Sequence, residues 1–393
     1  MLVERLQLTN FRGFEHLDLR FEPDLTVLVG VNGCGKTSVI DALLIGLNLQ
    51  VWSPRDVKVG HTEAEIRTVT PDHPDAFSHA ELVKNGTHVS TKSAGEIEPT
   101  YLPLVYGVWR GTWDDTPGST RPGEPWGPDR AKMQNYGSVS YGEFFKWLRE
   151  AEDEENEQIR YEGASEDPRL AAVRDAVRRL LPDYDHLRIR RRGAMGDERP
   201  RLTLEKDGSL LLFDSLSEGE RTLIAMIADI ARRLTIAHPD ADDPLTQPFL
   251  LVIDEFEQHL HPQWQRELPR RLHEVFPRAQ LIITTHSPIV VSEVLPRQIR
   301  ALKDFSLLET AHREGQDVNE ILEALFGTAS RKPETQRVID DAYDALDDDE
   351  LDEASTKIAT LDHQLGGDDP EVVRLKTLHR MLQGRNQDAL PEE

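Results

Sequence analysis

Residues 25–37, with the sequence LTVLVGVNGCGKT, decide the fold of this chain. The continuous apolar run Leu25–Val29 is typical of a strand buried in the middle of a sheet. The segment TSVIDALLIGL, which begins at Thr37, has apolar residues at helical spacing. Between strand and helix, residues 30–37 match the pattern G-x-x-x-x-G-K-[ST] in the context that this pattern requires. The stretch therefore predicts an α/β fold whose first loop binds the phosphates of a nucleotide.

The residue types in this loop explain how it would hold phosphates. Glycines let the backbone N–H groups point inward around an anion. Lys36 supplies a cation at the β- and γ-phosphates, and the Thr37 hydroxyl is a ligand suited to Mg²⁺. The predicted nucleotide-binding residues of the loop are Gly30, Asn32, Gly33, Gly35, Lys36, Thr37 and Ser38.

A second apolar run ends in two carboxylates. Residues 249–253 are FLLVI, and Asp254 and Glu255 follow directly. Because a parallel sheet brings the carboxyl ends of its strands to one edge, both acids are expected near Lys36. Asp254 is predicted to hold Mg²⁺ together with Thr37, and Glu255 to activate the attacking water. Lys36 and Glu255 are thus candidate catalytic residues.

Residues 214–221, DSLSEGER, precede the helical segment TLIAMIADIARRL. A serine hydroxyl and a glycine N–H at the positive end of a helix favour a bound anion. The alternative is an ordinary N-cap, in which Ser217 and Glu220 complete a capping box. Taken alone, the segment favours the N-cap.

Taken together, these elements resemble the ABC ATPases, whose signature sequence is usually LSGGQ and here reads LSEGE. The resemblance implies that Ser217, Gly219 and Glu220 of one subunit cover the γ-phosphate of ATP bound by another. It also implies that residues 257–262, EQHLHP, are similar to the D-loop region and that His286, in TTHSP, is the switch histidine. Catalysis would then need a head-to-tail pair of chains.

The N-terminal sequence NFRGF, residues 10–14, resembles the N-F-R-x-F element of RecF and SMC relatives, which implies that Arg12 lies close to the phosphates. A surface-loop arginine is the alternative. Two features depart from the superfamily. No motif identifies the Q-loop glutamine, although Gln134 is available, and Glu218 replaces the glycine of the signature.

The expected fold class is α/β: an ABC-type P-loop ATPase with a central, mostly parallel sheet, an antiparallel β subdomain, an inserted α/β region and a helical C-terminal tail. Residues 1–50 and 200–315 are expected to form the ATPase head. Residues 51–199 read as an insertion with short strands, a Pro/Gly-rich loop and a helical lid, and residues 316–393 as an acidic helical region. Asp207-Gly208, between two apolar alternations, predicts a hairpin.

Composition limits the partners. The formal net charge of −25 repels nucleic acid and anionic lipid over most of the surface. No apolar run reaches the roughly 18 residues of a membrane span, so a cytoplasmic protein is expected. A basic cluster interrupts the acidic background, and either a local DNA or RNA contact or a solvent face paired with carboxylates would explain it. Its members are Arg188, Arg190, Arg191, Arg192, Arg199 and Arg201.

Over almost its whole length the chain resembles the PtuA-like ATPases of Septu systems and certain retrons. The marks are YGEFFKWLREAEDEENEQIR, LSEGER, DEFEQHLHPQWQR, THSP with PRQIRAL, and GQDVNEILEALFG. This resemblance implies an ATPase of anti-phage defence, a homodimer or higher oligomer, that assembles with a separate HNH-type nuclease.

Two other classes fit less well. A coiled-coil SMC protein is disfavoured because proline and glycine run through the first half of residues 51–199. A built-in Toprim nuclease is disfavoured because Asp347 to Glu350 lie in a helical stretch without a preceding strand. The alternative function is a RecF-like DNA-repair ATPase that binds DNA without nuclease activity.

Overall fold

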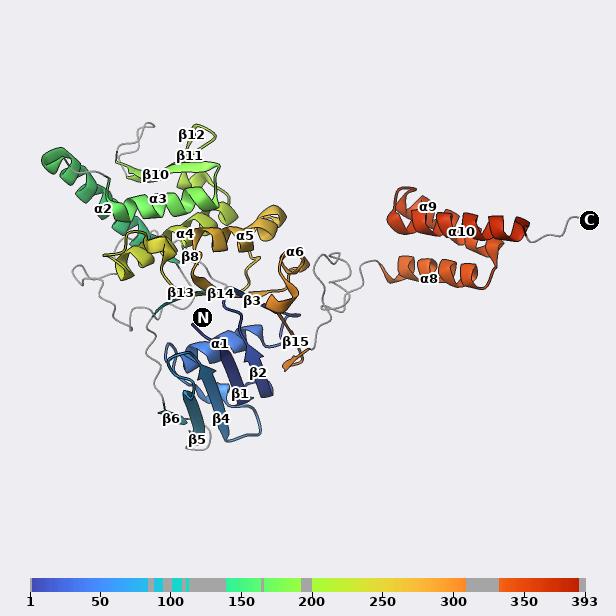
Figure 1. The fold of residues 1–393 in the computed structure, drawn as a ribbon, viewed down its shortest axis with the longest axis horizontal. Helices are drawn as coiled ribbons and strands as arrows, with labels where there is room; N and C mark the ends of the chain where they lie inside the picture. The colour runs from blue at the N-terminus through green and yellow to red at the C-terminus, as the bar shows by residue number, and fades with distance from the viewer. Residues whose placement is uncertain are drawn as a thin grey trace, which may run out of the picture. The chain divides into compact units, whose positions relative to one another are not determined.

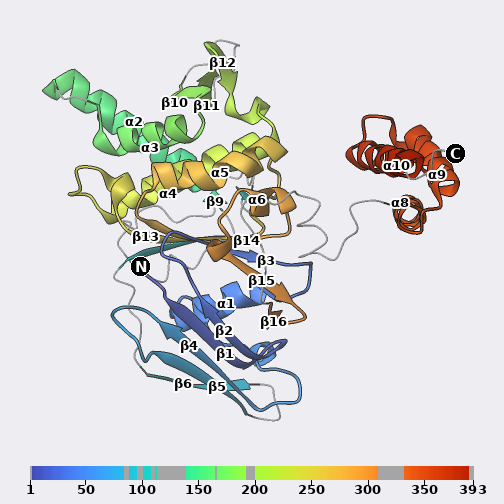
Figure 2. The same ribbon diagram turned by 45° about the vertical axis from the view of Figure 1, so that its right-hand side comes forward.

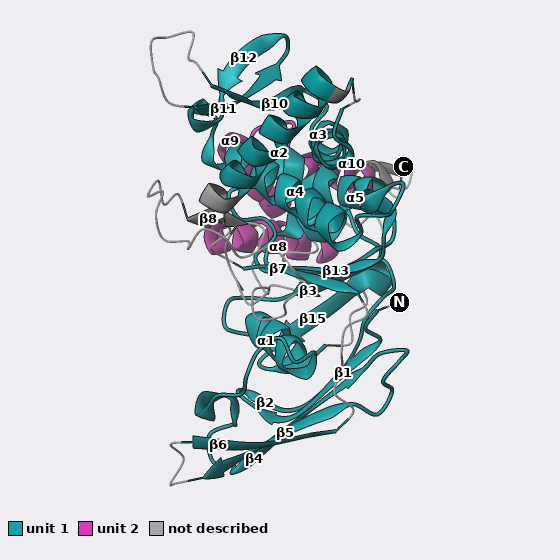
Figure 3. Ribbon diagram, turned by 90° about the vertical axis from the view of Figure 1, so that its left-hand side faces the viewer, with its two compact units in different colours: residues 1–321 teal, residues 322–393 magenta. Residues whose placement is uncertain are grey.

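The computed structural model describes residues 2–83, 88–94, 101–107, 111–112, 139–163, 166–191, 200–308 and 332–388. The chain divides into two compact units, residues 1–321 and 322–393 (Figure 3). The larger unit contains all the predicted nucleotide-site residues.

A six-stranded sheet forms the centre of the larger unit. Its strand order is β16 (Ser306–Leu307), β15 (Ile299–Lys303), β3 (Leu25–Val29), β14 (Ala279–Thr285), β13 (Phe249–Ile253) and β7 (Leu102–Tyr106). From β15 to β7 all neighbours run parallel, and only β16 pairs antiparallel. Every residue of β3, β13 and β14 is buried. This confirms the predicted parallel sheet and the strands read from unbroken apolar runs.

An antiparallel sheet lies on one side of the central sheet. Its order is β2 (Phe14–Arg20), β1 (Arg5–Phe11), β4 (Glu63–Val69), β5 (Phe77–Val83) and β6 (His88–Ala94). Helix α1 (Lys36–Gly46) lies between the two sheets (Figure 2). Its apolar residues join one core with β1, β2 and the facing side chains of β3, β13 and β14. Strands β1 and β2 form an antiparallel hairpin, with Leu8 opposite Leu17.

The other face of the central sheet is covered by helices (Figure 1). Helices α4 (Glu218–Ala237) and α5 (Pro262–Val275) lie next to the sheet, with the short α6 (Pro288–Ser292) near the end of β14, and α2 (Tyr141–Glu162) and α3 (Pro168–Leu180) pack outside them (Figure 1). Beyond them is a small antiparallel sheet of β10 (Tyr184–Arg190), β11 (Arg201–Lys206) and β12 (Ser209–Leu212). Asp207 and Gly208 form the turn between β11 and β12, both with positive φ, as predicted.

The segment expected as an insertion, residues 51–199, contributes to several layers. Strands β4 to β6 extend the antiparallel sheet, and β7 forms the edge of the central sheet beside β13. Two short strands, β8 (Gly111–Thr112) and β9 (Val139–Ser140), pair with each other. Gln134 lies outside the described residues.

The smaller unit consists of α8 (Pro333–Asp347), α9 (Leu351–Leu365) and α10 (Pro370–Asp388) among its described residues. Their apolar residues form a separate core that includes Leu346, Leu361 and Leu375. Asp347 to Glu350, expected in a helical stretch, lie between two helices: α8 ends at Asp347, and a turn follows in which Asp349 has a φ of 62°. Adjacent carboxylates repel each other, and aspartate tolerates turn conformations better than a helix interior.

Candidate active site

The loop between β3 and α1 accepts only glycine at two of its positions. Gly30 has a φ of 156°, and a Cβ there would lie 2.3 Å from the Leu302 carbonyl oxygen. Gly35 has a φ of 108°, and its Cβ would lie 2.6 Å from the Phe14 ring. The backbone of the loop is therefore fixed by close packing from both sides. Its tip, with Asn32 and Gly33, is exposed.

Lys36 is buried at the start of α1 and lies across this loop. Its ammonium group donates hydrogen bonds to the carbonyl oxygens of Gly30, at 2.7 Å, and Val31, at 3.2 Å. The side chain thus stays within the loop, at the place where the sequence predicts phosphates.

Thr37 and Asp254, predicted as ligands of one Mg²⁺, lie side by side although 217 positions separate them in the chain. The Thr37 hydroxyl donates to Oδ2 of Asp254 at 3.0 Å. Oxygen atoms of a hydroxyl and a carboxylate are the ligands that Mg²⁺ prefers, so the pair fits this ion. Among the described residues no group of three or more His, Cys, Asp or Glu side chains could hold a metal.

Thr284 and Tyr106, which no sequence pattern predicted as part of the site, hold Asp254 in place. The Thr284 hydroxyl donates to Oδ1 of Asp254 and accepts the backbone N–H of Glu255 at 2.8 Å. On the other side, the carbonyl of Tyr106 accepts the backbone N–H of Asp254 at 2.8 Å. Thr284 follows the apolar residues 281–283 of β14, which pairs with β13. A hydroxyl residue at the carboxyl end of such a strand is the sequence signal that could have identified Thr284.

Glu255 has a left-handed backbone, with a φ of 48°. Such a conformation costs a non-glycine residue on the order of 1 kcal/mol or more and is found preferentially at functional sites. The bond from its N–H to Thr284 helps to hold this conformation.

His286 is fixed by a buried carboxylate, that of Glu257. Oε1 of Glu257 lies 2.6 Å from Nδ1 of His286 and accepts the backbone N–H of His286 at 2.7 Å. Oε2 accepts the Thr285 hydroxyl at 2.7 Å. The side chain of Glu257 is 8% exposed, whereas that of His286 is 48% exposed. The sequence placed both residues in motifs but not in contact.

Ser217 caps α4, and the predicted capping box with Glu220 is confirmed. Oε2 of Glu220 accepts from the N–H and hydroxyl of Ser217, and Oε1 accepts from Tyr184 and from Lys206 at 3.0 Å. Burial raises the pKa of Glu220, but these hydrogen bonds outweigh it and lower the pKa to about 2. A Cβ on Gly219 would lie 2.1 Å from the carbonyl oxygen of His259. The start of α4 therefore lies against the segment 257–262.

Arg12 lies beside the first turn of α1. Its guanidinium forms ion pairs with Asp41, at 2.5 Å, and Asp56, at 2.8 Å, and lies 3.5 Å from the Ser38 hydroxyl. The side chain is 22% exposed. Arg12 is thus a positioned residue next to the nucleotide loop, and two carboxylates hold it there.

The basic cluster is largely paired with carboxylates. Arg188 lies 3.6 Å from Glu205, and Arg201 lies 3.1 Å from Asp214. Arg191 lies 2.6 Å from Asp153. These contacts favour the solvent-face alternative for the described arginines. Arg192 and Arg199 lie outside the described residues.

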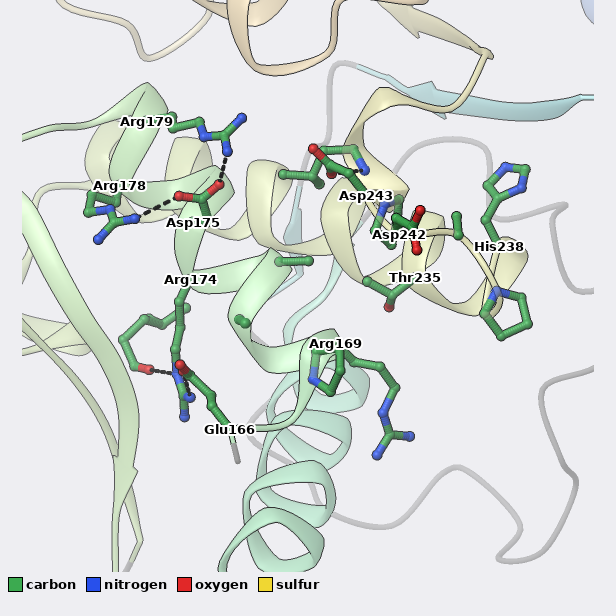
Figure 4. Close-up of a pocket in the computed structure, with 18 of the residues that line it drawn as sticks. Glu166, Arg169, Arg174, Asp175, Arg178, Arg179, Thr235, His238, Asp242 and Asp243 are labelled. Carbon is green, nitrogen blue, oxygen red and sulfur yellow. Dashed lines mark hydrogen bonds and ion pairs between the residues drawn. The ribbon is translucent and has the colours of Figure 1, made fainter. Parts of the chain in front are cut away.

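A pocket of about 780 Å³ opens between α3, β10 and the end of α4 (Figure 4). Acidic side chains pair with its arginines, as Asp175 does with Arg178 and Arg179. None of the predicted nucleotide-site residues lines it. This pocket is separate from the phosphate loop.

Comparison with known proteins agrees with this geometry. Residues 5–87 match the family model "AAA domain", and residues 127–292 match a second AAA-domain model whose description names the AbiEii toxin and a type IV TA system. The Retron Ec83 probable ATPase of Escherichia coli is 27% identical, over 95% of this chain and 86% of that protein. The Septu protein PtuA of Bacillus thuringiensis is 22% identical, over 88% of this chain and 90% of that protein.

A DNA replication and repair protein RecF, from Alkaliphilus oremlandii, is 42% identical, but over only 27% of this chain and 28% of that protein. In the part of the chain that the structure describes, no helix combines the length and apolar character needed to cross a membrane. The phosphate loop, the acidic end of β13, the parallel sheet and these similarities together identify the chain as an ABC-type ATPase.

Proposed function

We propose that this ATPase binds ATP with Mg²⁺, closes on a second copy of itself around the nucleotide, and regulates a separate HNH-type nuclease in defence against phage. The contact between Thr37 and Asp254, with Glu255 next in the chain, carries the nucleotide part of the proposal. It brings the phosphate loop and the acidic strand end to one place, as ATP hydrolysis requires.

We assign each residue a role from its surroundings or, for His286, from the resemblance to ABC ATPases. Lys36 exchanges the carbonyl oxygens of Gly30 and Val31 for phosphate oxygens. Thr37 and Asp254 would hold Mg²⁺, which would supply positive charge to stabilise the transferring phosphoryl group. Glu255 takes the proton of the attacking water, and His286 faces the γ-phosphate. Arg12 adds a fixed positive charge beside Ser38.

The exposed N-terminus of α4 supports the proposal that a second copy of the chain binds there. Ser217 and Glu218 are exposed at the N-terminus of a helix of 20 residues. A helix end of this length carries a partial positive charge and donor N–H groups that suit an anion. A γ-phosphate held by the partner chain is the anion that the ABC resemblance assigns to this end.

Substitution of Glu255 by Gln tests the ATPase mechanism. A positioned general base contributes on the order of 10² to 10⁴ in rate, so the variant should lose turnover by about that factor. It should still bind ATP and should accumulate as an ATP-dependent dimer in sedimentation. The control is Glu274→Gln, which changes an exposed glutamate on α5 that pairs with Arg270. Equal turnover of Glu255→Gln and the control would reject Glu255 as the base.

The nuclease partner is proposed from the similarity to PtuA and the retron ATPase. Co-expression with a neighbouring HNH-type gene should yield a complex that survives purification and whose DNA cleavage depends on ATP. The RecF similarity supports a second function, in DNA repair. Strong stimulation of the isolated ATPase by DNA, without such a complex, would favour that function and contradict the defence assignment.

A further inference from the structure

The contact between Glu257 and His286 shows which of the two side chains donates the hydrogen bond. Oε1 of Glu257 is 2.6 Å from Nδ1 of His286, and a carboxylate can only accept. Nδ1 must therefore be the protonated nitrogen of this contact. Because Oε1 also accepts the backbone N–H of His286, the carboxylate fixes both the ring and its main chain.

The surroundings leave Glu257 little freedom. Its other oxygen accepts the Thr285 hydroxyl, and that hydroxyl in turn accepts the N–H of Ser287 at 2.9 Å. The hydroxyl of Ser287 donates to Gln265 at 2.7 Å, so the loop after β14 is tied to the start of α5. The carboxylate is thus buried in a rigid frame, while the imidazole is half-exposed.

We propose that Glu257 is a positioning residue that gives His286 the proton arrangement needed to bind the γ-phosphate. With Nδ1 occupied by Glu257, the ring can reach a phosphate oxygen only through Nε2. Phosphate oxygens accept, so Nε2 must then carry a proton as well, and the ring becomes an imidazolium. The negative charge of Glu257 balances this cation beside the nucleotide. The inference rests on the proposed role of His286 in ATP hydrolysis.

Glu257→Gln tests the inference because the amide keeps the size of the side chain and an accepting oxygen but removes the charge. A hydrogen bond to a neutral acceptor is weaker than one to a carboxylate, and the difference should lower turnover roughly tenfold. We expect this loss in kcat with a small change in KM for ATP. The decisive measurement repeats the substitution in a His286→Ala background, where a residue that acts through His286 should have almost no further effect.

The matched control is Glu155→Gln. Glu155 is a buried glutamate that accepts a backbone N–H from Asp167 and pairs with Arg174, and it belongs to α2 and not to the nucleotide site. Its variant should keep wild-type turnover. Thermal melting and binding of a fluorescent ATP analogue establish that each variant is folded.

The outcomes separate the inference from the proposed function. Wild-type turnover in Glu257→Gln, or an equal loss with and without His286, overturns the inference. Wild-type turnover in His286→Ala overturns the proposed role of His286 itself. Should Glu257→Gln fail to fold, nitrogen-15 NMR of the wild-type protein gives a second test. With Mg²⁺ and ATPγS bound, both ring nitrogens of His286 should carry protons, and a neutral ring would refute the proposal.

Discussion

Replacing Thr284 by valine should disturb the position of the Asp254 carboxylate but leave the folding of the sheet intact. Valine has nearly the shape of threonine but lacks the hydroxyl that donates to Asp254 and accepts the N–H of Glu255. A hydrogen bond to a charged group contributes about 1.5 to 3 kcal/mol, and an unsatisfied buried N–H costs about 1 to 3 kcal/mol. If the transition state loses about 2 kcal/mol of stabilisation, kcat falls roughly 30-fold.

The assay is steady-state ATP hydrolysis at several Mg²⁺ concentrations. Thr284→Val should lower kcat and raise the Mg²⁺ concentration needed for half-maximal rate, whereas Thr284→Ser, which keeps the hydroxyl, should restore both. Thr26→Val is the matched control, because Thr26 is a fully buried threonine on the neighbouring strand β3 whose hydroxyl accepts the N–H of Glu22. A Thr284→Val variant with wild-type kcat and Mg²⁺ dependence would refute the reasoning.

Three further predictions follow from the site. Gly219→Ala should abolish turnover but keep ATP binding, because its Cβ would clash with His259; a titration with labelled ATP beside a turnover assay checks this. Glu220, whose pKa is lowered from 4.5 to about 2, stabilises the fold above pH 4.5 and loses that contribution as pH falls towards 2. Glu220→Gln should therefore flatten the acid side of a melting-temperature profile, and an unchanged slope would contradict the assignment. Alkylation of buried Cys34 should block nucleotide binding, because its sulfur packs against Gly30; unimpaired binding of ATP by fully alkylated protein would show that the loop tolerates the adduct.

Local sequence patterns predicted the parts of the fold whose causes are local. The apolar runs of β3 and β13 are buried strands because every side chain in them avoids water. Asp207-Gly208 predicted its turn because both residues tolerate positive φ. The chemistry of the phosphate loop and of Asp254 also follows from short patterns, and the meeting of Thr37 with Asp254 follows from the parallel sheet.

Strand β7 could not be predicted in this way. Its sequence LPLVY lies in a segment rich in proline, glycine and tryptophan, and Pro103 argues against a central strand. The structure places β7 at the described edge of the sheet, where proline is tolerated. The role of Tyr106 beside Asp254 depended on this placement and so had no sequence signal.

Side-chain partners far apart in the chain were beyond the reach of the sequence. Glu257 was assigned to a D-loop-like segment, and His286 to a switch position, but only the pairing of β13 with β14 brings them together. The same holds for Arg12, whose partners Asp41 and Asp56 come from α1 and from the turn after it. A single sequence identifies reactive groups more readily than it identifies the groups that orient them.

The position of β3 between β14 and β15 has a consequence for synthesis on the ribosome. Both neighbours of β3 belong to residues 279–303, about 250 residues after β3 itself. At roughly 5 to 20 residues per second, translation of that distance takes about 12 to 50 s. During this time the apolar segment 25–29 has no native strand to pair with, and an unpaired apolar strand invites association with other nascent chains. The nucleotide loop is therefore among the last parts of the larger unit to take shape, and a chaperone that shields the N-terminal segment during this interval should raise the yield of folded protein.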